Sequence, residues 1–436
     1  MKIVMVGAGY VGLVSAAGFA EFGNHVTIVD SVPDKVDAIR SGSVPFYEPG
    51  LPELVQRNVQ DGRLTPKLGL DEAVLNDADI VFLAVGTPQS VDGSANLRDL
   101  WDIVDLHLAA HSPRAKLVVV KSTVPPGTCA RVREKLRSVN GSWHVASNPE
   151  FLREGTAVED FMRPDRVVVG AFDGWSESML RRLYEPVSNC GPIICMDPAS
   201  SELTKYVSNA MLASRISWMN EVSRLAEKVG ADADMIRRGV GLDKRLGPKY
   251  LYPGPGFGGS CFTKDLQALS RIFGEAGLCE SAMAEAVLRV NVEQKHVPVE
   301  KLKRMVGSLS GKTVAVWGLA FKPFTDDVRD SPAIVIVQDL LDSGAKVRIH
   351  DPKAIANFMR IFPDVVPCSR HYDAAADADG LILVTEWREY RTPDFMLLRS
   401  MAPRISVVDA RNVWREEDAR EAGVPYARIG RVYGAP

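Results

Sequence analysis

The stretch KIVMVGAGYVG, residues 2–12, decides the fold that we expect at the start of this chain. It opens with a short β-branched run that ends at Val6, and a glycine-rich turn follows directly. A helix-like stretch then covers residues 13–22, and a second β run, residues 25–29, ends on Asp30. This order of strand, glycine turn, helix, strand and acid is typical of a dinucleotide-binding βαβ unit.

The three glycines of the turn, Gly7, Gly9 and Gly12, have separate physical roles. One makes the tight turn, one lets the backbone approach a pyrophosphate, and one lets the helix pack closely on the strand. A βα turn that is merely tight is the alternative. Asp30 suits the ribose hydroxyls of NAD and would repel the 2′-phosphate of NADP, so we expect NAD as the cofactor. Lys35 is either a cofactor contact or a solvated helix lysine.

The alternation of β runs and helical patterns continues beyond this unit. Further apolar β runs lie at residues 80–85, 117–120, 145–146 and 167–169, with helical patterns between several of them. Strands that alternate with helices indicate a mainly parallel, doubly wound sheet, because parallel neighbours need a crossover helix.

The middle of the chain changes character. Residues 200–229 are expected to be helical, and a loop rich in Gly and Pro follows at residues 248–260. A second helical stretch covers about 265–305, with a break near 274–277. The β pattern then restarts, with runs at residues 313–317, 346–350, 381–385 and 405–409.

We therefore predict an α/β protein in which two Rossmann-like, doubly wound α/β domains are joined by a central all-helical segment. The length of 436 residues agrees with this, because about 150 residues per domain gives roughly three parts. The expected boundaries are 1–198 for the first α/β domain, 199–307 for the helical segment and 308–436 for the second α/β domain.

The composition excludes several classes of protein. With 46% hydrophobic and 25% charged residues, the chain is neither disordered nor collagen-like nor a coiled-coil rod. A net charge of -3 gives no electrostatic argument for nucleic acid or for an anionic membrane. The uncharged run 3–20 imitates a signal peptide or a membrane span, but its glycines argue against both. No membrane or nucleic-acid partner is expected.

The six cysteines form neither a C-x-x-C pair nor a zinc-like cluster with histidine, so we expect no metal site and a reducing, cytoplasmic location. Cys261 differs from the other five, which fit the small buried hydrophobe that a free cysteine usually is. It lies between a glycine-rich turn and a helical stretch that starts near Thr263, with Lys264 beside it. A helix N-terminus and a nearby lysine favour the reactive thiolate. Asp265, one helical turn further on, is expected to face the same pocket.

Two further pairs have suggestive spacing. In NPEFLREG, residues 148–155, Asn148 and a following proline predict the start of a helix, which would place Glu150 and Glu154 on one face. An ordinary capping turn with solvated acids is the alternative. Lys205 and Asn209 lie four residues apart on an otherwise apolar helix, where the lysine either extends its amine to water or acts beside a substrate.

A dinucleotide site combined with a nucleophilic cysteine favours one chemistry. An enzyme that oxidises an alcohol past the aldehyde to the acid benefits from a thiolate, which adds to the aldehyde as a thiohemiacetal. Loss of a second hydride leaves a thioester, which water cleaves. Such a site needs a general base, a group that stabilises the oxyanion and a carboxylate that activates water.

The chain resembles the UDP-glucose 6-dehydrogenases of the UDP-glucose/GDP-mannose dehydrogenase family over essentially its whole length. Three residues depart from the usual pattern, namely Asn96, Trp218 and Thr263, and none of them is assigned to the chemistry. The motifs that carry the resemblance are GAGYVG at 7–12, FYEPGL at 46–51, VGTP at 85–88, STVPPGT at 122–128, NPEFLREG at 148–155, ELTKYVSNA at 202–210, PGPGFGGSCFTKD at 253–265, GLAFKPFTDDVRDSP at 318–332 and DARN at 409–412.

The resemblance implies NAD-dependent oxidation of C6 of UDP-glucose to UDP-glucuronate through a thiohemiacetal and thioester on Cys261, with two NAD consumed. It implies that Lys205 and Asn209 stabilise the oxyanion, that Asp265 and Thr123 organise a proton-accepting water, and that Glu150 activates the hydrolytic water. It further implies a central dimerisation domain and a C-terminal domain that binds the UDP-sugar, in a homodimer or higher assembly. Arg245 matches an arginine supplied by the neighbouring subunit, and Arg411 one that closes the site.

The remaining implied contacts form two groups. Together with the glycines of the first turn, Gly7, Gly9 and Gly12, the residues that match NAD contacts are Val11, Asp30, Lys35, Thr87, Thr123, Glu154, Lys264 and Arg329. Those that match the sugar-nucleotide site are Glu150, Phe151, Leu152, Arg153, Glu154, Lys205, Asn209, Tyr250, Leu251, Tyr252, Pro253, Gly254, Gly258 and Lys322.

Three alternatives remain open from the sequence. The same chemistry on GDP-mannose or a UDP-N-acetylhexosamine keeps the order of the motifs. A hydroxyacid dehydrogenase without a catalytic thiol shares the Rossmann-plus-helices plan, although GFGGSC, residues 256–261, argues against it. A nucleotide-binding regulatory module would not need Cys261, Lys205 and Glu150 together.

Overall fold

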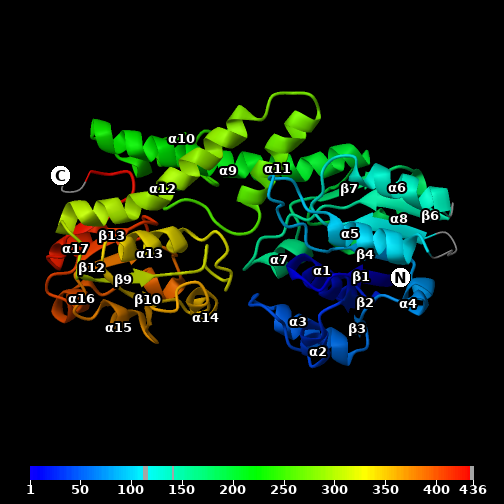
Figure 1. The fold of residues 1–436 in the computed structure, drawn as a ribbon, viewed down its shortest axis with the longest axis horizontal. Coiled ribbons are helices and arrows are strands. Elements are labelled where there is room, and N and C mark those ends of the chain that lie inside the picture. The colour runs from blue at the N-terminus through cyan, green and yellow to red at the C-terminus, as the bar shows by residue number, and fades with distance from the viewer. Residues whose placement is uncertain (111–115, 140–141, 433–436) are drawn as a thin grey trace. The chain divides into compact units, whose positions relative to one another are not determined.

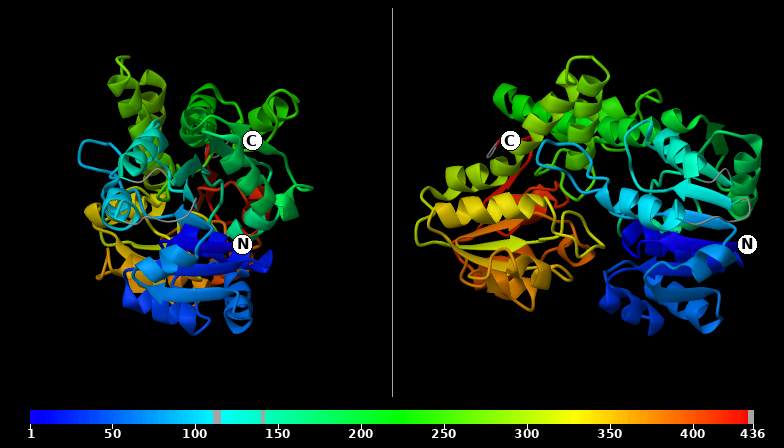
Figure 2. Two further views of the ribbon diagram at one scale, coloured as in Figure 1. Left: turned by 90° about the vertical axis from the view of Figure 1, so that its right-hand side faces the viewer. Right: turned by 45° about the vertical axis from the view of Figure 1, so that its right-hand side comes forward.

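The computed structural model describes residues 1–110, 116–139 and 142–432 (Figure 1). The chain divides into two compact units, Met1–Ser208 and Asn209–Pro436, and the boundary falls inside the long helix α9, Pro198–Val229. Each unit contains one sheet with helices around it, as two further views also show (Figure 2).

The first unit is built on an eight-stranded sheet in the order β3-β2-β1-β4-β5-β6-β7-β8. Neighbouring strands are parallel except for the antiparallel pair β6 and β7. The order of its first six strands is that of a doubly wound dinucleotide-binding sheet. The strands are β1 Lys2–Val6, β2 His25–Asp30, β3 Leu64–Leu68, β4 Ile80–Leu83, β5 Lys116–Val120, β6 Trp143–Ser147, β7 Val167–Ala171 and β8 Ile193–Met196.

Both faces of this sheet are buried, as the near-continuous apolar strands predict. Along β1, Ile3 and Met5 join one hydrophobic cluster while Val4 and Val6 join another. The helical elements of the unit are α1 Tyr10–Glu21, α2 Pro33–Arg40, α3 Leu51–Gln60, α4 Glu72–Asp77, α5 Arg98–Ile103, the π-helix η1 Val104–Leu108, α6 Thr128–Val139, α7 Ala157–Met162, α8 Gly174–Leu183 and the 3₁₀ turn η2 Glu185–Val187.

The second unit begins with helices and ends with a parallel sheet. The rest of α9 is followed by α10 Ala233–Gly241, α11 Phe262–Glu275 and α12 Ala282–Val306. The six strands run in the order β11-β10-β9-β12-β13-β14, which repeats the connectivity of the first sheet. They are β9 Thr313–Trp317, β10 Lys346–His350, β11 Val366–Pro367, β12 Gly380–Leu383, β13 Ser406–Asp409 and β14 Tyr426–Arg428, and the helical elements here are α13 Pro332–Asp342, α14 Ile355–Met359, α15 His371–Ala375, η3 Arg388–Tyr390, α16 Phe395–Met401 and α17 Glu416–Glu421.

The predicted fold class is confirmed: two doubly wound parallel sheets and a helical segment between them. The predicted break near residues 274–277 is confirmed as well, since α11 ends at Glu275 and α12 begins at Ala282. Strands β3, β8, β11 and β14 were not expected from the sequence. All four are edge strands of their sheets, and they are either shorter than five residues or, in β3, interrupted by a proline and a lysine. Within the described ranges, no helix is both long enough and apolar enough to cross a membrane.

The glycine turn after β1 yields a prediction about stability. A Cβ on Gly12 would overlap the carbonyl oxygen of Gly7, whereas a Cβ on Gly9 would have no atom within 4 Å. We expect Gly12→Ala to lower the free energy of unfolding by about 1–3 kcal/mol, because the backbone must move. Gly9→Ala, whose extended φ of -75° suits any residue, should stay within about 0.5 kcal/mol of wild type. Equal chemical-denaturation midpoints for the two variants would contradict this.

Candidate functional site

The predicted dinucleotide residues lie at the carboxyl edge of the first sheet, where α/β folds bind ligands. Gly7 adopts φ +103°, and a Cβ there would lie 2.7 Å from the carbonyl oxygen of Ala84, so glycine is required for the turn. The open space beside Gly9 leaves room for a phosphate against the backbone. Gly12 and Val11 lie in the first turn of α1, whose N-terminus favours an anion. These features fit a bound dinucleotide.

Asp30 ends β2 beside this turn. Its carboxylate accepts hydrogen bonds from the backbone N–H of Ala8, at 2.8 Å, and of Val32, at 3.0 Å. The amine of Lys35 lies 3.6 Å from the same carboxylate, so Lys35 belongs to this edge of the site. Nearby loops are tied together as well, since Thr87 Oγ1 donates to the backbone carbonyl of Thr123 at 2.9 Å.

The acid at the corresponding place in the second sheet makes the same kind of backbone contacts as Asp30 and further bonds, which cover it. Asp351 follows β10 and accepts hydrogen bonds from the backbone N–H of Leu319 and Ala320 and from the indole N–H of Trp387. It is 3% exposed, so its oxygens close a turn inside the protein. The geometry therefore favours the first sheet for the dinucleotide.

A buried ion pair joins two of the predicted catalytic residues. Lys205 Nζ, on α9, lies 2.9 Å from Glu150 Oε1, and the two side chains are 5% and 8% exposed. Glu150 Oε2 also accepts the backbone N–H of Leu152 at 2.5 Å. The amine and the carboxylate are therefore brought together in unit 1, and burial makes each dependent on the other.

The helix predicted at residues 148–155 is wrong. Residues 148–156 form a loop, and α7 begins only at Ala157, so Glu150 and Glu154 do not share a helical face. The reason is a long-range contact: the buried Glu48 carboxylate accepts the N–H of Gly155 at 2.5 Å and that of Ala157 at 2.7 Å. These bonds supply the cap of α7 from a distant residue.

Glu48 is a residue whose role the sequence did not reveal. It is 1% exposed and also accepts the hydroxyl of Tyr10, in the first turn of α1. Burial and the neighbouring carboxylate raise the pKa of the Tyr10 hydroxyl, so Tyr10 remains the donor. One carboxylate thereby connects the dinucleotide helix to the loop that carries Glu150. The only signal was its position in the motif FYEPGL.

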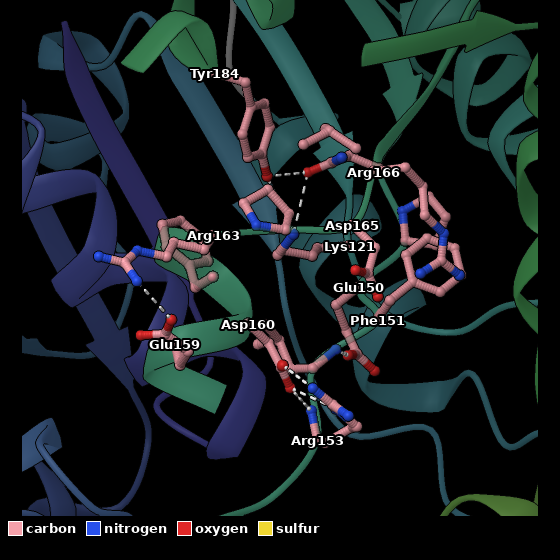
Figure 3. A pocket seen from close by; sticks show the side chains of 16 residues that line it. Lys121, Glu150, Phe151, Arg153, Glu159, Asp160, Arg163, Asp165, Arg166 and Tyr184 are labelled. Atoms are coloured by element: carbon pink, nitrogen blue, oxygen red, sulfur yellow. Dashed lines mark hydrogen bonds and ion pairs between the residues drawn. The ribbon is translucent and has the colours of Figure 1, made fainter. Parts of the chain in front are cut away.

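The rest of this loop faces a cavity of roughly 150 Å³ within unit 1 (Figure 3). The Arg166 guanidinium lies 3.6 Å from the centre of the Phe151 ring, a cation–π contact that holds the ring. Leu152 is half-buried, and Arg153 is paired with Asp160 at 2.5 Å, as the dashed lines show (Figure 3). The guanidinium of Arg153 is therefore engaged by α7 in this structure.

Glu202 is a second buried acid that the sequence did not single out. It lies one turn before Lys205 on α9 and accepts the N–H groups of Gly127 and Cys129, both at 2.7 Å. These N–H groups lie at the start of α6, directly after the loop that contains Thr123. Burial raises the pKa of the Glu202 carboxyl. The first turns of α9 and α6 are thus joined within unit 1.

In unit 2, the predicted nucleophile stands at the N-terminus of α11. Cys261 is the N-cap residue, it is exposed, and its backbone carbonyl accepts the N–H of Asp265 at 2.8 Å. The Asp265 carboxylate is 1% exposed and accepts Asn209 Nδ2 and Lys264 Nζ, each at 2.6 Å. The structure therefore joins Asp265 to Asn209 and Lys264, one helical turn after Cys261. Asn209 follows Lys205 by one turn of α9.

The glycine-rich loop before Cys261 is held by polar side chains that sequence reasoning missed. Gly254 N–H donates to Asn220 Oδ1 at 2.8 Å, and its carbonyl accepts Gln294 Nε2 at 2.8 Å. Asn291 exchanges two hydrogen bonds with the backbone of Phe257. The sequence feature that could have revealed them is the presence of three amide side chains, Asn220, Asn291 and Gln294, in helices, where all three are buried. Asn291 and Gln294 lie one turn apart on α12.

The predicted substrate residues of this loop are placed with little freedom. A Cβ on Gly258 would overlap the carbonyl of Asp330, so only glycine fits. Tyr250 adopts φ +62°, Leu251 is buried, and Tyr252 is 59% exposed with the Arg237 guanidinium 4.6 Å from its ring centre. Pro253 is buried beside them.

Four cationic side chains of unit 2 that the sequence analysis assigned to ligands contact other groups of the same chain in this structure. Arg411 Nε donates to the carbonyl of Val384 at 2.5 Å and lies 3.1 Å from Glu386. Arg329 pairs with Asp327 at 2.6 Å, and Lys322 Nζ lies 5.2 Å from the centre of the Phe321 ring. Arg245 has a side chain that is 88% exposed and pairs with Asp243 at 2.7 Å.

Known proteins resemble this chain over almost all of its length. Models of the UDP-glucose/GDP-mannose dehydrogenase family match in order: the NAD binding domain at residues 1–188, the central domain at 199–293 and the UDP binding domain at 315–416. A UDP-glucose 6-dehydrogenase of Pseudomonas aeruginosa is 43% identical, with 99% of this chain and 98% of the relative covered. One of Rhizobium meliloti is 44% identical, with 99% and 100% covered.

A solved structure also resembles this chain over almost its whole length. The UDP-glucose dehydrogenase of Pyrobaculum islandicum superposes with a TM-score of 0.90 at 41% identity and covers 99% of this chain and 98% of its own. The resemblance inferred from the motifs is confirmed, and NAD is the cofactor that the matched N-terminal domain binds. The chain belongs to the UDP-glucose/GDP-mannose dehydrogenase family.

Proposed function

We propose that this protein oxidises the C6 alcohol of UDP-glucose to the carboxylate of UDP-glucuronate, with Cys261 as the nucleophile. The observation that carries the proposal is the group around Asp265, in which an exposed thiol stands one turn from a buried carboxylate that binds Asn209 and Lys264. The relatives at 43% and 44% identity are UDP-glucose 6-dehydrogenases, which supports UDP-glucose over GDP-mannose or a UDP-N-acetylhexosamine.

The residues of this chain divide the chemistry between them. Bound NAD supplies the acceptor for one hydride at each of the two oxidations. Asp265 and Thr123 organise the water that takes the hydroxyl proton, and the Cys261 thiolate forms a C–S bond to the aldehyde. Lys205 and Asn209 stabilise the resulting oxyanion, and collapse of this adduct leaves a thioester. Glu150 deprotonates the water that attacks the thioester and releases the acid and the thiol.

The remaining assignments belong to the same proposal. Gly7, Gly9, Val11, Gly12, Asp30, Lys35, Thr87, Glu154, Lys264 and Arg329 contact NAD, and residues 150–154, 250–254, Gly258, Lys322 and Arg411 contact the sugar nucleotide. We place the functional boundaries at 1–198, 199–307 and 308–436, and the enzyme in the cytoplasm, where its six free thiols would persist.

The reaction is tested by counting NADH against sugar nucleotide. Purified protein is given excess NAD and limiting UDP-glucose, GDP-mannose or UDP-N-acetylglucosamine, and the NADH absorbance and the product mass are recorded. We expect two NADH per UDP-glucose and one UDP-glucuronate, because the alcohol loses four electrons. One NADH per sugar would indicate a simple alcohol dehydrogenase, and preference for another sugar nucleotide by kcat/KM would overturn the substrate assignment.

We also propose that the protein works as a homodimer through α9. This helix presents exposed apolar side chains at spacings of four and seven residues, which place them on one side of the helix. Such a continuous apolar stripe is typical of an interface with a second chain. The stripe comprises Leu203, Val207, Met211, Trp218, Leu225 and Val229, of which Trp218 is 64% exposed. In this assembly, Arg245 enters the neighbouring subunit's site.

The proposed dimer is tested by introducing a charged residue into the apolar stripe of α9. Trp218→Glu should convert the dimer to a monomer, because a carboxylate in an apolar interface is costly to desolvate. Light scattering after size exclusion gives the mass. Met396→Glu is the matched control, since Met396 is 66% exposed on α16 and lies outside the stripe. A wild-type protein that is monomeric at micromolar concentration, or a Trp218→Glu protein that remains dimeric, would contradict the proposal.

A further inference from the structure

Strand β5 carries a buried lysine at each end. Lys116 is its first residue and Lys121 follows its last, and they are 5% and 3% exposed. The Lys116 amine donates to the backbone carbonyls of Leu75 and Asn76 at the amino edge of the sheet. Lys121 lies at the carboxyl edge, where the proposed chemistry takes place. Buried lysines are rare unless something requires the charge.

The Lys121 amine is held by neutral groups. It donates to Asn148 Oδ1 at 3.1 Å and to the Tyr184 hydroxyl oxygen at 3.3 Å. Tyr184 in turn donates to Asn148 Oδ1 at 2.6 Å, and Asn148 Nδ2 donates to the carbonyl of Val168 at 2.9 Å. Within the described part of the chain, no carboxylate lies within 4.0 Å of this amine. Lys121 therefore orients Asn148, two residues before Glu150.

The charged groups that face Lys121 come from two elements. Glu150, in the loop 148–156, favours the protonated amine, and Lys205, on α9, opposes it. Burial lowers the pKa of Lys121 to about 8, so the amine is largely protonated at pH 7. Burial also raises the pKa of the Tyr184 hydroxyl, which stays neutral. Lys121, Glu150 and Arg166 line the same cavity (Figure 3).

We propose that Lys121 is a positioning residue of this site, which orients through Asn148 the loop that carries Glu150. The proposal rests on the proposed role of Glu150 in hydrolysis. No other assigned role explains why a cation lies buried at this edge of the sheet.

The test is the pH dependence of kcat with UDP-glucose and NAD. Lys121→Met keeps the apolar stem but removes both the hydrogen bond to Asn148 and a cation that lines the same cavity as Glu150. We expect the acid limb of the profile to move to higher pH by about one unit, the order of effect that a nearby charge has on a carboxyl group. Lys116→Met removes a buried lysine from the other end of the same strand and should leave the limb where it is.

A second readout does not depend on the reaction. Lys121 has a folded pKa of about 8, below its ordinary value of 10.5, so the unfolded chain binds more protons between these values. Burial of the charge therefore costs stability below pH 8, and this cost fades as pH rises toward 10.5. The melting temperature of Lys121→Met relative to wild type should accordingly fall between pH 8 and pH 10.

The outcomes separate the two proposals. An acid limb that moves in Lys121→Met and not in Lys116→Met, together with the change in relative melting temperature, supports the role of Lys121. An unmoved limb, or an equal shift in both variants, overturns it. If wild type oxidises no UDP-glucose, the proposed function fails. If instead the melting temperature of Lys121→Met relative to wild type does not change with pH, Lys121 does not carry a buried charge, whatever the activity.

Discussion

The buried ion pair between Glu150 and Lys205 is the contact on which the arrangement of the first unit's site depends. Its atoms are 2.9 Å apart and its side chains are almost fully buried, so neither charge is tolerable without the other. The pair fixes the loop 148–156 against α9, and Glu48 fixes the end of that loop against α1. The dinucleotide turn and the residues to which we assign hydrolysis and oxyanion stabilisation, Glu150 and Lys205, are thereby held by two buried acids of one unit.

The parallel sheet explains why these groups meet. Asp30 is the last residue of β2, Lys121 and Asn148 directly follow β5 and β6, and these strands end at the same edge. Backbone ladders fix the register of the strands, so the polar residues after them have little freedom. In the second unit the same role is taken by helices, because α9 and α12 hold the glycine loop before Cys261 through Asn220, Asn291 and Gln294.

Much of this could be predicted from the sequence, wherever the signal is local. The turn at Gly7, the acid Asp30 and the one-turn spacing of Cys261 and Asp265 all depend on neighbours along the chain. The helix expected after Asn148 failed because Glu48, about a hundred residues earlier, supplies the cap at Ala157 instead. The edge strands β3, β8, β11 and β14 were not foreseen, because short strands at the edge of a sheet give only a weak sequence pattern. Long-range hydrogen bonds leave no periodic trace in a sequence.

We propose that Glu150 activates the water that hydrolyses a thioester on Cys261, and intact-protein mass spectrometry of quenched Glu150→Gln enzyme with UDP-glucose and NAD is the direct test of this role. The amide keeps the size but removes the basicity, so hydrolysis should slow by about 10²–10⁴-fold and a covalent sugar-nucleotide adduct should accumulate. The adduct should be absent from Glu150→Gln/Cys261→Ala and from Glu154→Gln. An adduct in Glu154→Gln alone would reverse the two roles, and no adduct in either single variant would contradict the account.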